Sequence, residues 1–175
     1  SVNLRNTPEI KFVLDQSIEY GVNISKKIDE VTRDLKDGAE EWMIVLNDVL
    51  KGKHSVAIGG HIRPDGDCVG STIGLYLYLT TYYPEIETDL YLEEIPEAFQ
   101  MMGHRDVPKH EIVEGKVYDL FISLDCGDER RLGFSEPVFQ NAKETLCVDH
   151  HVSNESFADT NYIVPDASST SELVF

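Results

Sequence analysis

The sequence lacks any long apolar run. Across its 175 residues no stretch approaches the roughly 20 consecutive apolar residues that span a bilayer. The first residues also lack the basic and then apolar order of a signal peptide. These absences argue against a membrane protein, and they predict a cytoplasmic location.

Cysteine and basic residues are also scarce. The chain has three cysteines, an odd number, and they lack C-x-x-C spacing. Each of them, Cys68, Cys126 and Cys147, lies in or beside an apolar run, so we expect reduced, buried thiols. With 15 basic and 32 acidic residues, the formal net charge of -17 argues against binding of long duplex nucleic acid through many phosphates. Short phosphorylated substrates stay compatible, because divalent cations in an acidic pocket reverse the local field.

Apolar segments alternate with helical stretches from residue 39 onward. We expect strands at 55–60, 87–92, 118–124, 145–148 and 160–164, and helices at 39–50, 72–83, 95–102, 135–142 and from 168. This alternation predicts an α/β fold, a parallel sheet flanked by helices. Met101 and Met102 are interpreted as packing residues. Asp37 and Gly38 interrupt the pattern, so we divide the chain into residues 1–37 and 38–175.

Polar side chains follow three of the expected strands. They are His61, Asp65, Asp67, Asp125, Asp149, His150 and His151. Because the carboxyl ends of parallel strands meet at one edge, where α/β sheets hold their sites, we expect these groups to lie together. Carboxylates mixed with imidazoles predict a centre for two metal ions, with Mn²⁺ favoured over Mg²⁺. For residues 61–71 alone, a polar Pro-Asp-Gly turn is the alternative.

A two-metal centre would predict hydrolysis at phosphorus. Two divalent ions about 3.5–4 Å apart can share a carboxylate and a water, deprotonate that water and stabilise an in-line attack. No serine or cysteine nucleophile is then needed. The sequence has no G-x-x-x-x-G-K-[ST] loop, which disfavours an ATPase of that type.

Four segments carry a resemblance to a known family. Residues 61–71 (HIRPDGDCVGS), 124–133 (LDCGDERRLG) and 148–151 (VDHH), followed by 167–172 (ASSTSE), resemble the first three motifs of the DHH phosphoesterases in order and spacing. The resemblance covers residues 40–175 and is greatest to the bacterial oligoribonucleases that also remove the 3′-phosphate of adenosine 3′,5′-bisphosphate. It implies short RNA oligonucleotides or phosphorylated nucleotides as partners, and it leaves a homodimer open. Cyclic-dinucleotide hydrolysis is an alternative with the same motifs.

The resemblance also implies roles for the metal-ligating residues. His61 and Asp65 would bind one metal, and Asp67 and His150 the other. Asp125 would bridge the two ions. These five residues are therefore the expected metal ligands.

Further roles are implied for four neighbouring residues. Asp149 and His151 match the family's triplet, whose members bind or orient metal and the attacked phosphate, and we expect them to be catalytic. Asp128 and Arg131 match a D-x-x-D-x-x-R pattern in which the arginine contacts substrate or closes the site. Arg131 is thus expected to be both catalytic and substrate-binding, and Asp128 substrate-binding. A surface salt bridge is the alternative for this pair.

Two parts of the family's pattern are missing. The family's fourth-motif aspartate and its C-terminal substrate-binding domain would lie beyond Phe175. We therefore expect a piece of a longer chain, inactive by itself.

The first residues resemble a different protein. Residues 4–13 (LRNTPEIKFV), 15–22 (DQSIEYGV) and 24–28 (ISKKI) resemble the end of ribosome-binding factor A. The resemblance implies the last strand and helix of a KH-like RNA-binding domain without its earlier elements. Contact with the small ribosomal subunit through residues 1–35, with a role in 30S maturation and rRNA processing, is thus an alternative function.

Overall fold

The structure is a computed structural model that describes residues 46–175. The KH-like remnant predicted within residues 1–37 and the domain boundary near Gly38 lie outside the described residues. The helix expected at 39–50 is described only from residue 46, and it is helical from there to residue 50.

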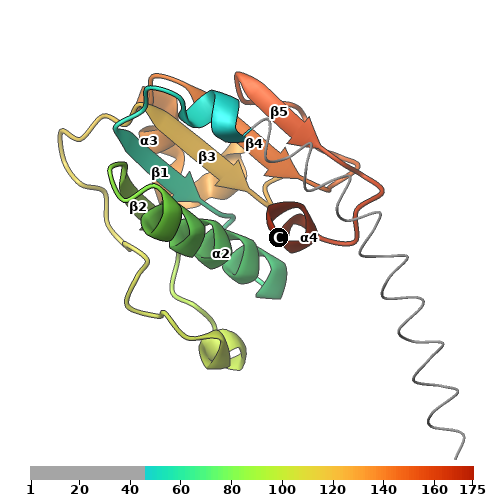
Figure 1. Ribbon diagram of the computed structural model, residues 1–175. Coiled ribbons are helices and arrows are strands. Elements are labelled where there is room, and N and C mark those ends of the chain that lie inside the picture. The colour runs from blue at the N-terminus through green and yellow to red at the C-terminus, as the bar shows by residue number, and fades with distance from the viewer. Residues whose placement is uncertain (1–45) are drawn as a thin grey trace, which may run out of the picture. The chain divides into compact units, whose positions relative to one another are not determined.

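A five-stranded parallel sheet forms the centre of the described part (Figure 1). Its strands are β1 (Ser55–Gly59), β2 (Glu87–Tyr91), β3 (Leu120–Leu124), β4 (Thr145–Asp149) and β5 (Thr160–Ile163). Their order across the sheet is β2-β1-β3-β4-β5, and every neighbouring pair is parallel. This confirms the predicted α/β class. The carboxyl ends of β1, β3 and β4 therefore share one edge.

Helices cover both faces of this sheet. Apolar side chains of α2 (Gly66–Tyr82) and α4 (Thr170–Val174) pack with one face of the strands, as Leu79 and Leu173 do. The opposite face packs against α3 (Glu136–Asn141) and the 3-10 turn η2 (Glu129–Ser135), through Phe139 and Leu132. All five residues of β3 are buried between the two layers. The run of apolar residues in β3 is therefore typical of a central parallel strand.

Helix α2 begins at Gly66, six residues before its predicted start. Asp65 is the cause, because its Oδ1 accepts hydrogen bonds from the N–H groups of Asp67 (3.0 Å) and Cys68 (3.1 Å). Asp67 consequently lies in the first turn of a helix, and its side chain has a fixed direction.

Other elements agree with the sequence to within a few residues. The helix expected at 95–102 is the 3-10 turn η1 (Glu97–Met102). The packing interpretation is wrong for Met101, which is 91% exposed, whereas Met102 is 43% exposed and its methyl group lies against Gly70. Cys68, Cys126 and Cys147 are buried and free, as predicted. Within residues 46–175, no helix is long and apolar enough to cross a membrane.

Candidate metal centre

The carboxyl ends of β1, β3 and β4 bring imidazole and carboxylate groups together. His61 lies two residues after β1, Asp125 directly follows β3, and Asp149 is the last residue of β4. Asp125 is only 1% exposed and has a φ of 59°, in the left-handed region that few residues other than glycine adopt. Backbone strain of this kind gathers at functional sites. Asp125 thus lies at the centre of the site in a conformation that the surrounding structure must enforce.

Two histidines present the same ring nitrogen to Asp125. Nδ1 of His61 lies 2.8 Å from the carbonyl oxygen of Ile62, and Nδ1 of His150 lies 3.2 Å from that of Ala167. A carbonyl only accepts, so each Nδ1 carries the proton and each Nε2 keeps a free lone pair. This is how metal-binding histidines are usually oriented.

The free nitrogens approach different oxygens of Asp125. Nε2 of His61 is 3.6 Å from Oδ2, and Nε2 of His150 is 3.8 Å from Oδ1. Both distances are too long for a hydrogen bond. The Asp125 carboxylate raises the pKa of His61, as does the Ile62 carbonyl, whereas burial lowers it. A buried carboxylate flanked by two free imidazole nitrogens is a donor set that fits divalent transition metals.

The helix start adds two carboxylates to this site. Oδ1 of Asp65 lies 3.8 Å from Nε2 of His61, and Oδ2 of Asp67 lies 3.6 Å from Nε2 of His150. Burial would raise the pKa of Asp65, but the N–H groups of Cys68 and Asp67 and the nearby His61 lower it. The structure therefore places Asp65 beside His61 and Asp67 beside His150, which are the pairs that the family resemblance implied for two ions.

Asp149 holds His151 instead of facing Asp125. It is fully buried, its Oδ1 lies 2.7 Å from Nδ1 of His151, and its Oδ2 accepts a hydrogen bond of 2.7 Å from Nδ2 of Asn154. Both carboxylate oxygens are thus occupied by the chain itself. His151 is half-exposed, and its Nδ1 also lies 3.7 Å from Oδ1 of Asp125. Asp149 is arranged to fix the tautomer and direction of His151 at the rim of the centre.

Arg131 lies in η2, and Asp128 directly precedes this turn. The carbonyl of Arg131 accepts a hydrogen bond of 2.7 Å from the N–H of Ile62, so this turn is fastened to the loop after β1. The guanidinium is near enough to His61 to lower its pKa slightly against the effect of Asp125. Asp128 lines a separate, largely polar cavity with Glu129 and other η2 and α3 residues. Within residues 46–175 neither residue forms a salt bridge, so that alternative gains no support there.

Three residues of the site were not predicted from the sequence. Thr170 donates a hydrogen bond of 3.0 Å from Oγ1 to Oδ1 of Asp125. Asn154 binds Asp149, and Cys68 lies close to His61 and Asp125. Burial raises the pKa of the Cys68 thiol well above its usual value, so this sulfur is protonated in the absence of a metal ion. Thr170 and Cys68 had a sequence signal, since they stand in the quoted segments 167–172 and 61–71, whereas Asn154 lies outside all quoted segments.

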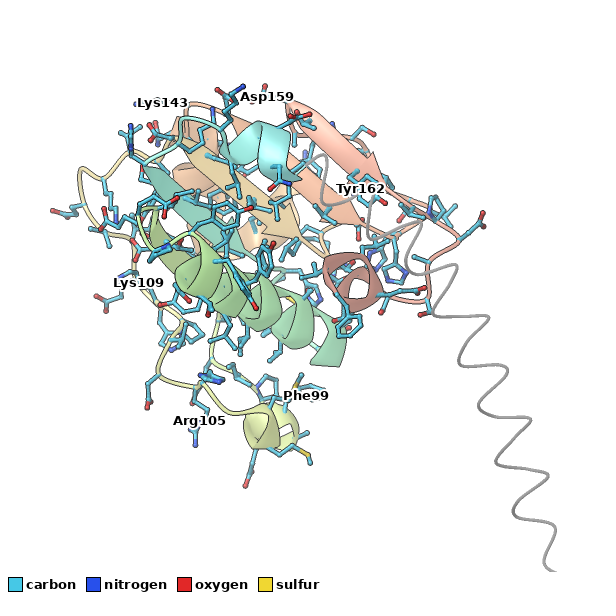
Figure 2. The ribbon with its side chains drawn as sticks, in the orientation of Figure 1. Phe99, Arg105, Lys109, Lys143, Asp159 and Tyr162 are labelled. Carbon is cyan, nitrogen blue, oxygen red and sulfur yellow. The ribbon has the colours of Figure 1, made fainter. Side chains whose placement is uncertain are left out.

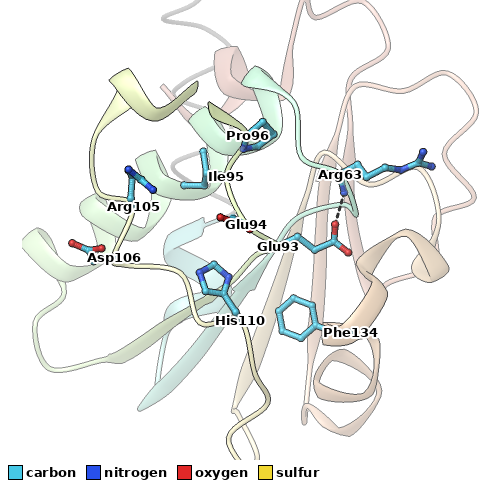
Figure 3. Close-up of a pocket in the computed structure, with 9 residues that line it drawn as sticks. All are labelled: Arg63, Glu93, Glu94, Ile95, Pro96, Arg105, Asp106, His110 and Phe134. Carbon is cyan, nitrogen blue, oxygen red and sulfur yellow. Dashed lines mark hydrogen bonds between the residues drawn. The ribbon is translucent and has the colours of Figure 1, made fainter. Parts of the chain in front are cut away.

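A cavity of about 790 Å³ lies beside the loops that follow β1 and β2 (Figure 3). Its lining includes Arg63, Glu93, Arg105, His110 and Phe134. Oε2 of Glu93 accepts a hydrogen bond of 2.7 Å from the N–H of Arg63, which holds the loop after β1 in place. The cavity is large enough for a small organic ligand and carries charges of both signs.

Comparison with known proteins identifies the domain. The family model described as "DHH family, N-terminal domain" matches residues 55–175. The chain belongs to the DHH family. This DHH domain contains the whole parallel sheet and every candidate metal ligand described above.

Two longer relatives resemble the DHH domain. The bifunctional oligoribonuclease and PAP phosphatase NrnA of Bacillus subtilis is 26% identical over 122 residues, which are 69% of this chain and 37% of that protein. The crystal structure of an exopolyphosphatase-related protein from Bacteroides fragilis superposes with a TM-score of 0.65 at 25% identity, covering 78% of this chain and 42% of that one. The chain therefore spans well under half the length of these relatives.

A third relative matches a short segment at high identity. Ribosome-binding factor A of Lachnospira eligens is 81% identical over 32 residues, which are 18% of this chain and 25% of that protein. The resemblance inferred for the first 35 residues is thereby confirmed at the level of sequence.

Proposed function

We propose that this DHH domain belongs to a metal-dependent phosphoesterase that hydrolyses short oligoribonucleotides, adenosine 3′,5′-bisphosphate or both. One observation carries the proposal. His61 and His150 turn their Nε2 atoms to opposite oxygens of the buried Asp125, at 3.6 and 3.8 Å. This geometry suits a carboxylate that bridges two cations, each of which also has an imidazole and a further carboxylate within reach.

Each ligand residue has a separate part in holding the ions. Two adjacent divalent cations, with Mn²⁺ favoured for this mixed donor set, would supply Lewis acidity and would lower the pKa of a bound water. Asp125 would keep the two sites at a fixed separation. His61 and Asp65 would complete one site, and Asp67 and His150 the other.

Residues at the rim would act on the phosphate. Asp149 keeps the proton of His151 on Nδ1, so Nε2 of His151 is free to accept a proton or to take up a second one and donate it. Arg131 lies near His61 and carries the fixed positive charge and planar donors that suit a phosphate. We therefore assign proton transfer to His151, its orientation to Asp149 and phosphate binding to Arg131. Asp128, in the same turn as Arg131, is assigned to substrate binding.

A short substrate agrees with the charge of the chain. With a formal net charge of -17, the protein would repel a long polyanion, whereas one or two phosphates can be held at cations in the centre. The printed name of the Bacillus relative, an oligoribonuclease and PAP phosphatase, points to the same class of substrate.

The test is a hydrolysis assay on the protein expressed from its natural gene. We expect Mn²⁺ to support cleavage of a diribonucleotide or release of phosphate from adenosine 3′,5′-bisphosphate, and we expect EDTA and Asp125→Asn to abolish both. Equal activity of wild type and Asp125→Asn would contradict the proposal. Preferential cleavage of a cyclic dinucleotide in the same assay would replace the proposed substrate with that alternative.

A second candidate function rests on the first 35 residues. The 81% identity to ribosome-binding factor A over 32 residues supports contact with the small ribosomal subunit through this segment. Co-sedimentation with that subunit tests the idea. Binding that is lost on deletion of residues 1–35 would support it, and binding that survives the deletion would refute it.

A further inference from the structure

Segment 168–172 contacts Asp125 from more than 40 residues away in sequence. Thr170 is fully buried, and its Oγ1 donates a hydrogen bond of 3.0 Å to Oδ1 of Asp125. Within residues 46–175 this is the single hydrogen bond that the Asp125 carboxylate receives. Among hydrogen bonds, that of Thr170 alone therefore acts on the orientation of the central carboxylate.

The same segment also holds Asp67. The N–H of Thr170 donates to Oδ2 of Asp67 (2.8 Å), and the N–H of Ser171 donates to Oδ1 (2.7 Å). The hydroxyl of Ser171 donates to the backbone carbonyl of Asp67 at 3.1 Å. Figure 1 shows the short helix α4 beside the first turns of α2, where Asp67 lies. Thr170 therefore connects a ligand on α2 with the ligand after β3.

The segment itself is fastened at its start. Ser169 caps α4 by accepting a hydrogen bond of 3.1 Å from the N–H of Glu172. The carboxylate of Glu172 in turn accepts hydrogen bonds from the N–H (2.7 Å) and the hydroxyl (2.6 Å) of Ser168. This reciprocal capping leaves Thr170 little freedom to move away from Asp125.

A carboxylate can rotate about its Cβ–Cγ bond, and the torsion is broad when nothing holds it. The hydrogen bond from Thr170 selects the orientation in which Oδ1 faces His150 and Oδ2 faces His61. We propose that Thr170 is a positioning residue whose hydroxyl orients the bridging carboxylate and thereby sets the affinity of the centre for divalent metal. This inference rests on the metal centre of the proposed function.

Three variants of the full chain separate positioning from packing. Thr170→Val keeps the shape of the side chain and removes the hydroxyl, whereas Thr170→Ser keeps the hydroxyl and removes the methyl group. Thr88→Val is the matched control, because Thr88 is also buried, lies in β2 and bonds only a backbone carbonyl of its own strand region. Mn²⁺ affinity is measured by isothermal titration, and thermal unfolding is followed without metal.

We expect Thr170→Val to weaken Mn²⁺ binding by about 10- to 100-fold, the usual effect of losing a group that orients a ligand. Thr170→Ser and Thr88→Val should bind Mn²⁺ within about twofold of wild type, although their unfolding temperatures change. Thr170→Ser also keeps the test decisive if Thr170→Val does not fold, because a purely packing role predicts that the serine variant loses affinity.

Two results would overturn the inference. One is wild-type Mn²⁺ affinity in folded Thr170→Val, and the other is equal loss of affinity in Thr170→Ser. Asp125→Asn distinguishes this failure from failure of the proposed function. If Asp125→Asn loses Mn²⁺ affinity and Thr170→Val does not, only the positioning role of Thr170 is wrong. If Asp125→Asn binds Mn²⁺ as wild type does, the proposed metal centre is wrong.

Discussion

Aspartates lie at both edges of the sheet, but the chain pairs them differently. At the amino edge, Asp119 accepts hydrogen bonds from the N–H groups of His54 (2.8 Å) and Ser55 (3.2 Å) and from Lys143 (2.7 Å). Asp159 likewise accepts from the N–H and hydroxyl of Thr145, both at 2.9 Å (Figure 2 labels Lys143 and Asp159). At the carboxyl edge, Asp125 receives one hydrogen bond from Thr170 within the described residues.

The contrast distinguishes acids that fasten the sheet from Asp125, which we propose as a metal ligand. At the amino edge the acids satisfy the first N–H groups of neighbouring strands, so they fasten the sheet. At the carboxyl edge the imidazole nitrogens stand 3.6–3.8 Å from a buried carboxylate, near it but not bonded to it. A buried charge without full pairing destabilises the fold, and such a cost is typical of a site that takes a ligand. Asp119 at the amino edge and Asp125 at the carboxyl edge should therefore respond in opposite ways to the loss of the carboxylate charge.

The largest effect is expected from Asp125→Asn. Removal of the central negative charge should lower Mn²⁺ affinity by more than about 100-fold, beyond the usual effect of a residue that only orients a ligand. Without metal, the variant should unfold at the same temperature as wild type or higher, because an incompletely paired buried charge is gone. Calorimetry with and without Mn²⁺ measures both. A variant that is less stable without metal and binds Mn²⁺ normally would abolish the contrast between the edges.

Asp149→Asn should lower Mn²⁺ affinity less than Asp125→Asn does, but it should strongly lower the rate of hydrolysis. A neutral amide in place of this carboxylate could no longer fix the proton of His151 on Nδ1, so hydrolysis should fall by about 10²- to 10⁴-fold, the range of a lost acid–base group. Mn²⁺ affinity should change less than in Asp125→Asn. Initial rates and metal titrations on the same sample make the comparison. If Mn²⁺ affinity falls as far as in Asp125→Asn, Asp149 acts on the metal sites and not through His151.

Arg131→Met should weaken substrate binding and leave Mn²⁺ affinity nearly unchanged. We expect KM to rise about 10-fold with little change in Mn²⁺ affinity, because one charge-assisted contact to a phosphate is worth about 1.5–3 kcal/mol. Arg130→Met is the matched control, since Arg130 and Arg131 are adjacent, equally charged and both exposed in the same turn. Equal KM values for the two variants would remove Arg131 from the site.

The sequence alone locates the sheet and the acids at its carboxyl edge, because buried parallel strands read as apolar runs that end in polar residues. It does not show how those residues are held. By sequence Asp65 lies within a Pro-Asp-Gly turn, yet its side chain caps α2, and the helix starts at Gly66. Thr170 stands 45 positions after Asp125, and no periodicity links two such distant residues. Contacts of this kind depend on tertiary packing.

At the amino edge, Asp119→Asn should destabilise the fold by about 1 kcal/mol and leave Mn²⁺ affinity unchanged. The Lys143 ammonium and the N–H groups of His54 and Ser55 hold the pKa of Asp119 down to about 2, below its usual 3.8. The stabilisation from this lowered pKa is present above pH 3.8 and is lost as the pH falls toward 2. The free energy of unfolding of wild type and Asp119→Asn, measured at pH 7 and at pH 3, tests this pH dependence.

The variant should lose less stability than wild type between the two pH values, and the exposed Asp48→Asn should behave like wild type. An equal loss in Asp119→Asn and wild type would show that Asp119 does not fasten this edge.

The most direct measurement is anomalous diffraction from crystals of the protein grown with Mn²⁺. We predict two anomalous peaks that flank Asp125, one beside His61 and the other beside His150. Peaks elsewhere, or no peak within bonding distance of Asp125 in Mn²⁺-saturated crystals, would contradict it.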